Sequence, residues 1–251
     1  MHDKIQTSSI MPDFTLARLQ GYPAHEEAKP CSFENTKVDR AMYIEEQLYL
    51  LETIFDADFC GAQNIEIKYM DLPWKTSSPQ IAEHSFKALS QHPRNHSDII
   101  LYISMNSLRV AAGWHAVAGK YSPANQELIW QDSNGHNPPD EVMQAARIAF
   151  PDLKIKSLNL RQQGDHYSCA YFTIYNMFSF ANGFTPDENI DPRRLRWALN
   201  RILPSRLIDQ GYKEFSEART ISPEEQVFIN VRKALIGIQL HERKLGANHR
   251  L

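Results

Sequence analysis

Residues 113–133 read GWHAVAGKYSPANQELIWQDS, and this stretch decides the fold. It contains two β-prone runs, 113–121 and 126–133, on either side of the turn formers Ser122-Pro123-Ala124-Asn125. Apolar, β-branched and aromatic residues favour strands, whereas Pro, Asn and Ser favour the tight connection between them. The sequence therefore predicts an antiparallel hairpin in the middle of the chain.

The turn also sets the register of this hairpin. With residues 122–125 as the connection, Tyr121 pairs with Gln126, and counting outward puts His115 opposite Asp132. Side chains directly opposite each other on antiparallel strands have Cβ atoms about 4.5–5.5 Å apart. We therefore predict that an imidazole and a carboxylate meet across the two strands.

The segments around the hairpin complete an α+β pattern. Spacings of three and four between apolar residues predict amphipathic helices, and alternation or apolar runs predict strands. Strands are predicted at 65–69, 98–105 and 154–160, and helices at 39–56, 79–89, 140–150 and 169–182. Because the strands from 98 to 133 follow one another through short turns, we expect a mixed, largely antiparallel central sheet flanked by helices, with helical N- and C-terminal extensions.

The chain divides into three parts by composition. Residues 1–90 are an N-terminal arm followed by a helical and strand extension, and within them 1–38 are an irregular lead-in with weak periodicity. Residues 91–186 form the core that carries the candidate site, and 187–251 form a more polar helical extension packed on it.

Composition excludes several classes of protein. With 42% hydrophobic and 23% charged residues and a net charge of -3, the 251-residue chain is typical of a soluble globular protein. It lacks the basic balance of a nucleic-acid binder and any apolar stretch long enough to span a bilayer, and its N-terminus has no apolar signal core. We expect a cytoplasmic monomer without a cofactor.

The cysteines do not predict a disulfide framework or a zinc site. There are three, Cys31, Cys60 and Cys169, an odd number without regular spacing or a C-x-x-C pair. His92 and His96 are four residues apart, but Pro93 between them argues against the helix that would align them as metal ligands. We expect a solvated loop there and no metal.

Cys169 has the context of a nucleophile. It lies where the polar loop RQQGDHYS (161–168) becomes an apolar helix, with Ser168 as a favourable N-cap. The dipole and unpaired N–H groups of a helix N-terminus favour a thiolate, which is the reactive form. The alternative is a small apolar residue inside the helix, since free cysteines are often buried.

Three further residues complete a catalytic set. His115, on a strand, has the chemistry of a general base, and Asp132 would orient it and stabilise its imidazolium form. Gln163, six positions before Cys169, carries an amide that could donate to an oxyanion beside the helix N-terminus. Gln162 competes for that role.

The order His (GWHAVAG), acid (IWQDSNG), Gln and Cys (RQQGDHYSCAYFTIYNM) resembles the clan CE cysteine peptidases. This group includes SUMO and ubiquitin-like-protein proteases, bacterial effector deubiquitinases and YopJ-type acetyltransferases. The resemblance covers roughly residues 98–183 and implies that His115 is the base, Asp132 its orienter, Gln163 the oxyanion donor and Cys169 the nucleophile.

Two positions depart from the family pattern. The family usually reads Asp-Cys-Gly, whereas Ser168-Cys169-Ala170 stands here. An aromatic residue commonly follows the family's histidine and forms one wall of a narrow cleft, whereas Ala116 follows His115 here. Because residues i-1 and i+1 share a face of a strand, Trp114 is the candidate substrate-binding side chain in its place.

Three functions are compatible with these residues. The first is a thiol isopeptidase, a deubiquitinase or ubiquitin-like-protein protease, whose partner is the modifier protein. The second is acetyl transfer from coenzyme A, for which basic residues would contact the polyanion: Arg193, Arg194, Arg196, Arg232 and Lys233. The third is a binding module of the same fold without turnover. Asp132 favours the peptidase branch, since the acetyltransferases more often carry Glu there, and the resemblance also implies a bacterial effector secreted into a host cell.

Overall fold

The computed structural model describes residues 12–26, 40–72, 79–105 and 115–210, together with residues 227 and 231. Its elements, in chain order, are α1 (Pro12–Gln20), α2 (Ile44–Ile54), α3 (Ala57–Gln63), β1 (Ile65–Asp71), α4 (Pro79–Ser90), β2 (Asp98–Ser104), β3 (Ala116–Ser122), β4 (Glu127–Gln131), α5 (Asp140–Ala149), β5 (Lys154–Ser157), α6 (Cys169–Ala181) and α7 (Pro192–Asn200). Among these helices, none combines the length and the apolar character needed to cross a membrane.

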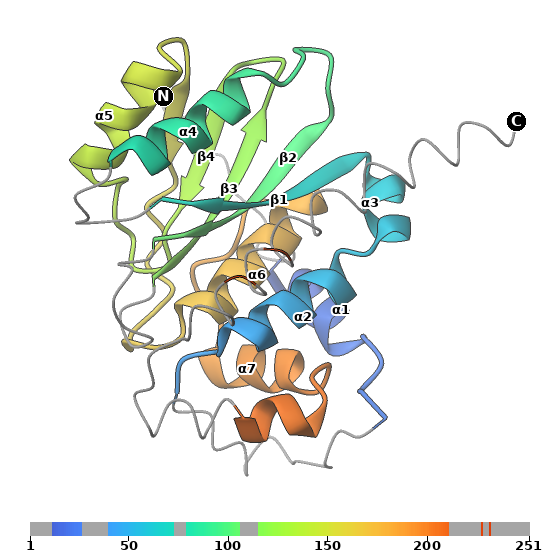
Figure 1. The fold of residues 1–251 in the computed structure, drawn as a ribbon. Helices are drawn as coiled ribbons and strands as arrows, with labels where there is room; N and C mark the ends of the chain where they lie inside the picture. Colours follow the sequence, from blue (N-terminus) through green and yellow to red (C-terminus); the bar gives the residue numbers. More distant parts are fainter. Residues whose placement is uncertain are drawn as a thin grey trace, which may run out of the picture.

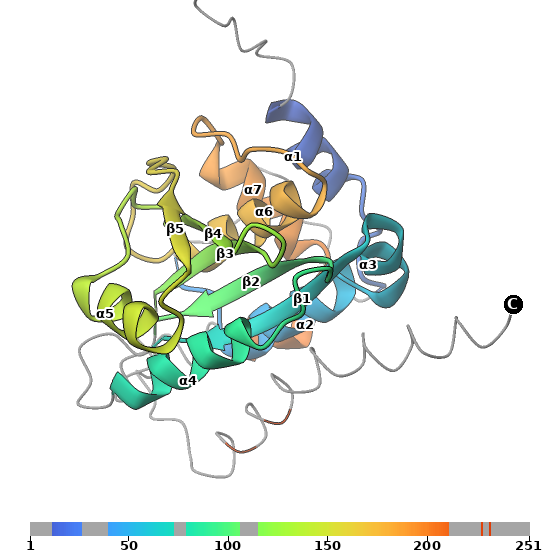
Figure 2. The same cartoon turned by 90° about the horizontal axis from the view of Figure 1, so that it is seen from above.

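The five strands form one mixed sheet in the order β1-β2-β3-β4-β5. Strands β2, β3 and β4 are antiparallel neighbours, as predicted, whereas β1 and β5 run parallel to β2 and β4 at the two edges. Helices α4 and α5 cover one face of the sheet, and α6, with α2, α1 and α7 beyond it, covers the other (Figure 1). Figure 2 shows α4 lying along the sheet when it is viewed from that face. The α+β architecture predicted from the sequence is confirmed.

Helix α6 is the central element of the larger core. All thirteen of its residues are buried, and it packs against β2 and β3 on one side and against α1, α2 and α7 on the other. A helix that is apolar around its whole circumference is stable only when other elements surround it. The sequence CAYFTIYNMFSFA therefore fixes α6 inside the molecule, with its N-terminus beside the start of β3.

The hairpin of β3 and β4 forms, but its predicted register is wrong. The connection is Pro123–Gln126, so that Ser122 pairs with Glu127 and Tyr121 with Leu128. Gln126 adopts a left-handed backbone conformation, with φ of 51°, and β3 ends at Ser122, one residue later than predicted. Each residue of β3 therefore pairs with a β4 residue two positions later than predicted. His115 and Asp132 are consequently not a direct cross-strand pair. A shift of two residues leaves every side chain on its predicted face of the sheet.

The flanking segments differ from the predictions in two respects. The lead-in is not irregular over residues 12–20, because α1 buries Leu16 and Leu19 against α6 and α7. The helix predicted at 39–56 is shorter, since Asp56 accepts a hydrogen bond from the Phe59 backbone N–H and caps α3 instead. Most of residues 211–251 lies outside the described part of the chain.

Gly119 of β3 tests the packing at the centre of the sheet. A Cβ atom there would stand 3.0 Å from Ile103 Cδ1 and 3.2 Å from both Leu101 Cβ and Leu128 Cδ1. We expect Gly119→Ala to lower the free energy of unfolding by about 1–3 kcal/mol through overpacking, measured by urea denaturation. Gly61→Ala in α3 is the matched control, because a Cβ there meets nothing within 4 Å and Ala favours the helix. Equal stability of the two variants would contradict the packing described.

Candidate active site

Cys169 is the first residue of α6 and lies at the wall of a cavity. Cys169 is 6% exposed, and neither it nor Cys60 is part of a disulfide. Ser168 occupies the N-cap position, as predicted, but its hydroxyl accepts no hydrogen bond from the helix N–H groups. The predicted N-cap position is confirmed, whereas the Ser168 hydroxyl is engaged by Asp165 and Arg196 instead of by the helix.

His115 and Asp132 meet at the edge of the hairpin, just outside both strands. His115 Nε2 lies 2.9 Å from Asp132 Oδ1, which is within the distance of an ion pair. The N–H bond of Nε2 does not point at this oxygen, so the contact lacks hydrogen-bond geometry. The His115 carbonyl accepts from the Met105 N–H at 2.8 Å, which extends the β2–β3 ladder by one residue. The two side chains thus interact diagonally, although the backbones are not in direct register.

The loop after β4 holds the Asp132 carboxylate in place. Asp132 Oδ1 also accepts from the Asn134 N–H at 2.8 Å, and Oδ2 lies 3.6 Å from Nδ1 of the exposed His136. Gly135, with φ of 77°, returns its N–H to the Asp132 carbonyl at 2.9 Å. A carboxylate that is 5% exposed and held by a backbone donor is suited to orient an imidazole.

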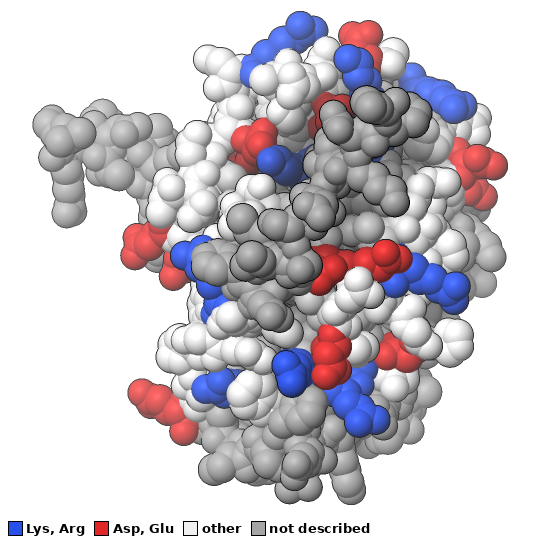
Figure 3. Space-filling model, turned by 180° about the vertical axis from the view of Figure 1, so that it is seen from behind, with Lys and Arg blue, Asp and Glu red and all other residues white. Residues whose placement is uncertain are grey.

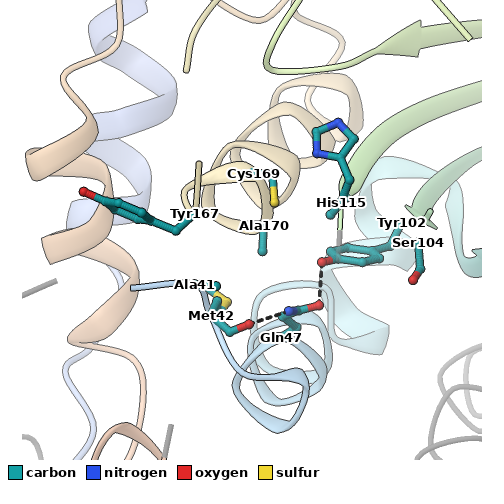
Figure 4. A pocket seen from close by; sticks show the side chains of 10 residues that line it. Ala41, Met42, Gln47, Tyr102, Ser104, His115, Tyr167, Cys169 and Ala170 are labelled. Atoms are coloured by element: carbon teal, nitrogen blue, oxygen red, sulfur yellow. Dashed lines mark hydrogen bonds between the residues drawn. The ribbon is translucent and has the colours of Figure 1, made fainter. Parts of the chain in front are cut away.

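His115 lies between the acid and the thiol. With Nε2 toward Asp132, its other ring nitrogen is the one available to Cys169, and Figure 4 shows the imidazole beside the sulfur. Burial lowers the pKa of His115, but the close approach and the charges of Asp132 and Cys169 outweigh it and raise the pKa to about 10. The geometry therefore favours an imidazolium at neutral pH, placed beside the Cys169 sulfur.

Gln162 and Gln163 have different surroundings. The Gln162 amide is buried and bonded to the Asn176 side chain, in both directions at 2.9 Å, and to the Asp187 carbonyl at 2.6 Å. Gln163 accepts from Ser133 Oγ at 2.7 Å and donates to the Asp165 carbonyl at 2.6 Å. Gln162 therefore has a structural role inside the core, while Gln163 ties the loop before Cys169 to the residue after Asp132.

A small cavity of about 20 Å³ lies next to Cys169 and His115. Its wall includes three alanines, Ala41, Ala116 and Ala170, and larger side chains from other elements: Met42, Gln47, Tyr102, Ser104 and Tyr167 (Figure 4). Sequence reasoning did not identify the contribution of residues 41–47 to this wall.

One signal for that contribution was present in the sequence. Gln47 lies three residues after Ile44 and four before Leu51 of α2, so a polar amide interrupts the apolar face of a helix. The structure shows its partners, since Gln47 accepts from Tyr102 Oη at 2.6 Å and donates to the Met42 carbonyl at 2.7 Å. Trp114, the candidate substrate contact, lies outside the described residues.

The other candidate groups are not assembled at this site. Arg196 is 6% exposed and directed into the protein, whereas Arg194 is exposed and faces Asp191, so these two do not form one anion-binding cluster. Arg232 and Lys233 lie outside the described residues. On the face in Figure 3, described Lys and Arg side chains are interspersed with Asp and Glu, rather than gathered into a basic field.

His92 and His96 lie in a loop, as expected, but close to Glu66 of β1. Donor atoms of the three residues are within 4.8 Å of one another, a spacing that a metal ion could bridge. The Lys68 ammonium, however, contacts His92 Nε2 and lies 3.2 Å from Glu66 Oε1. A cation from the chain itself therefore balances this cluster, and we assign it no metal.

Comparison with known proteins gives structural neighbours only. No family model and no curated protein matches the chain. The Ulp1-like SUMO protease catalytic domain of Chaetomium thermophilum is 14% identical, over 84% of this chain and 95% of that one, with a TM-score of 0.44. The Ulp1 protease domain in complex with SMT3, the yeast orthologue of SUMO, is 12% identical over 80% and 97%, with a TM-score of 0.42.

An effector protein of Rickettsia bellii is 12% identical, over 72% of this chain and 95% of that one, with a TM-score of 0.40. Likeness at these identities and TM-scores carries no argument about function, which is inferred from the geometry of the site.

The coupling of His115 to Asp132 predicts how both protonation and stability respond to pH. We expect His115 to titrate near pH 10, and Asp132→Asn to lower its pKa by about 1–3 pH units, as followed by NMR of ¹⁵N-labelled histidine. Because the folded-state pKa exceeds 6.5, this pair stabilises the fold fully below about pH 6.5, and the contribution is lost as pH rises toward 10.

Asp98→Asn is the matched control, because its carboxylate pairs with Lys120 at 3.0 Å and makes no such contact with His115. It should leave the titration of His115 unchanged. A wild-type His115 that titrates at or below its ordinary value would contradict the ion pair.

Proposed function

We propose that this chain is a thiol isopeptidase that releases ubiquitin or a ubiquitin-like protein from lysine side chains. The observation that supports this most is the position of His115, which has one ring nitrogen 2.9 Å from Asp132 Oδ1 and the other directed toward Cys169. A nucleophile, a base and an orienting acid in contact form the arrangement that covalent acyl transfer requires.

The chemistry begins with an imidazolium–thiolate pair. The Cys169 sulfur attacks the isopeptide carbonyl, an S–C bond forms, and the C–N bond breaks as His115 gives its proton to the departing lysine amine. Water then attacks the thioester, and His115 removes one of its protons. The S–C bond breaks, the modifier leaves as a C-terminal carboxylate after the second proton of the water passes to solvent, and the proton on His115 restores the resting pair.

Two groups are proposed to stabilise the oxyanion. One is the N-terminus of α6, whose first N–H groups receive no side-chain cap from Ser168. The other is Gln163, whose amide nitrogen donates to the Asp165 carbonyl in the resting protein. Gln163 can act in this way only if its amide donates one N–H to the oxyanion instead of to Asp165.

The cavity favours a slender substrate tail. The alanines beside Cys169 and His115, Ala116 and Ala170, project little into it, while Tyr167 and Met42 bound it from the α6 loop and the lead-in to α2. An unbranched Gly-Gly tail fits such a wall better than a bulky acyl group. We propose Trp114 as a further substrate contact, and delivery to a host cell as an effector follows from the motif's resemblance alone.

The proposal predicts covalent capture by Cys169. Ubiquitin and SUMO probes that end in an electrophile should form an adduct with the wild-type protein and none with Cys169→Ala. His115→Gln should slow adduct formation by about 10²–10⁴-fold, because the thiol loses its base. Gel shift followed by mass spectrometry of the Cys169 peptide measures both. Cys60→Ala, which removes the other buried thiol, is the matched control and should react as the wild type.

Two outcomes would replace the proposal. The absence of a Cys169-dependent adduct with every modifier probe, in a folded protein, would exclude the isopeptidase. Cys169-dependent transfer of label from radioactive acetyl-coenzyme A would then indicate acetyl transfer. If neither the modifier probes nor acetyl-coenzyme A label Cys169, a binding module without turnover would be the remaining function.

A further inference from the structure

The loop before Cys169 is organised around one carboxylate, that of Asp165. Its Oδ1 atom accepts the backbone N–H groups of Tyr167 at 3.0 Å and Ser168 at 2.7 Å. The Gln163 amide nitrogen lies 2.6 Å from the Asp165 carbonyl and 3.3 Å from Oδ1. Asp165 therefore sets the path of the chain from the proposed oxyanion donor to the residue before the nucleophile.

Ser168 connects this carboxylate to another helix. Its hydroxyl, in a residue with no exposed surface, donates to Asp165 Oδ2 at 2.7 Å and accepts from Arg196 Nη1 at 2.7 Å. The hydroxyl proton of Ser168 is thus used by the loop, and one of its lone pairs is used by the guanidinium from α7. This explains why Ser168 does not cap α6, although Ser is a favourable N-cap residue.

Arg196 supplies the charge that the loop requires. It comes from α7, whose Leu195, Ala198 and Leu199 are buried in the core shared with α6. Nη1 also lies 3.1 Å from Asp165 Oδ2, and the guanidinium stands over the Tyr167 ring at 5.7 Å. A guanidinium that is 6% exposed is costly to bury unless it is paired, so its direction into this loop is a specific arrangement.

The electrostatics of Asp165 agree with these contacts. Burial tends to raise the pKa of Asp165, but hydrogen bonds from Ser168 and Tyr167 and the charge of Arg196 outweigh it and hold the pKa below its usual value. The carboxylate therefore remains ionised and able to accept these bonds at neutral pH.

We propose that Arg196 is a positioning residue for Cys169, acting through Asp165 and Ser168, and that α7 is thereby part of the active site. The inference rests on the proposed function for the reaction that it serves. Ser168 is followed directly by Cys169, so a displacement of its hydroxyl moves the first turn of α6 and the sulfur relative to His115. Because Tyr167 lines the cavity, the same guanidinium also fixes part of the substrate wall.

The test measures alkylation of Cys169 by iodoacetamide in the full-length chain, by mass spectrometry of the Cys169 peptide. Arg196→Met removes the guanidinium and keeps an unbranched stem. We expect it to slow alkylation at neutral pH by about tenfold or more while the circular dichroism spectrum stays native, because thiolate and imidazolium no longer meet. Arg194→Met on the same helix is the matched control and should react at the wild-type rate, since the Arg194 side chain is 62% exposed.

Two additional variants separate positioning from folding. Ser168→Ala removes the hydroxyl but leaves Asp165 and Arg196 3.1 Å apart, so we expect a smaller loss of rate than in Arg196→Met. Arg196→Lys keeps the charge without the planar fork and should recover part of the rate. A wild-type rate in folded Arg196→Met would overturn the proposal, even if its melting temperature falls. If that variant does not fold, a wild-type rate in Ser168→Ala would overturn it.

Alkylation requires no modifier protein, so this test is independent of the isopeptidase assay. A slowed Cys169 in Arg196→Met, together with no probe adduct in the wild type, would retain the positioning role and reject the proposed substrate. A normal probe adduct in the wild type, together with unaltered alkylation in Arg196→Met, would retain the proposed substrate and reject the positioning role of Arg196.

Discussion

Helix α6 has no solvent-facing side, and this constraint determines where Cys169 lies. All thirteen residues of the helix are buried between the sheet and the layer formed by α1, α2 and α7. Rotating or sliding α6 would expose aromatic residues or create voids, both of which are costly in a close-packed core. The first residue of α6 is therefore held beside the ends of the central strands, where β3 begins and β4 ends. The position of Cys169 is fixed by packing, independently of its contact with His115.

The hairpin of β3 and β4 brings the side chains of His115 and Asp132 to Cys169. Since β3 lies against α6, a residue just before β3 stands beside the start of the helix, and that residue is His115. Asp132, just after β4, reaches the same imidazole from the neighbouring strand. The acid holds a proton on His115, and the thiol gains a charged partner in a site with little solvent. Arg196 adds a connection from α7, so the loop before Cys169 is supported by elements on both sides of α6.

Much of this arrangement could be predicted from the sequence, because periodicity and local context carry the information. The helix that begins at Cys169, the three antiparallel strands and the order of polar residues all follow from neighbouring residues in the chain. The exact pairing of β3 with β4 could not be predicted, since it depends on Gln126 adopting a left-handed conformation that its residue type does not favour. The prediction still placed His115 near Asp132, because a register shift of two residues leaves each side chain on the same face of the sheet.

The remaining features depend on contacts between distant parts of the chain. Arg196 and Asp165 are 31 positions apart, and α1 is helical because α6 and α7 cover it, so no local pattern indicated either. We expect His115 to make Cys169 reactive although this thiol is buried. The most direct measurement compares iodoacetamide alkylation of Cys169 and Cys60 in one sample, because these thiols are 6% and 3% exposed and differ mainly in their partners. We predict that Cys169 reacts about tenfold faster or more, and that His115→Gln removes the difference. Equal rates in the wild-type protein, or an unchanged difference in His115→Gln, would contradict the account.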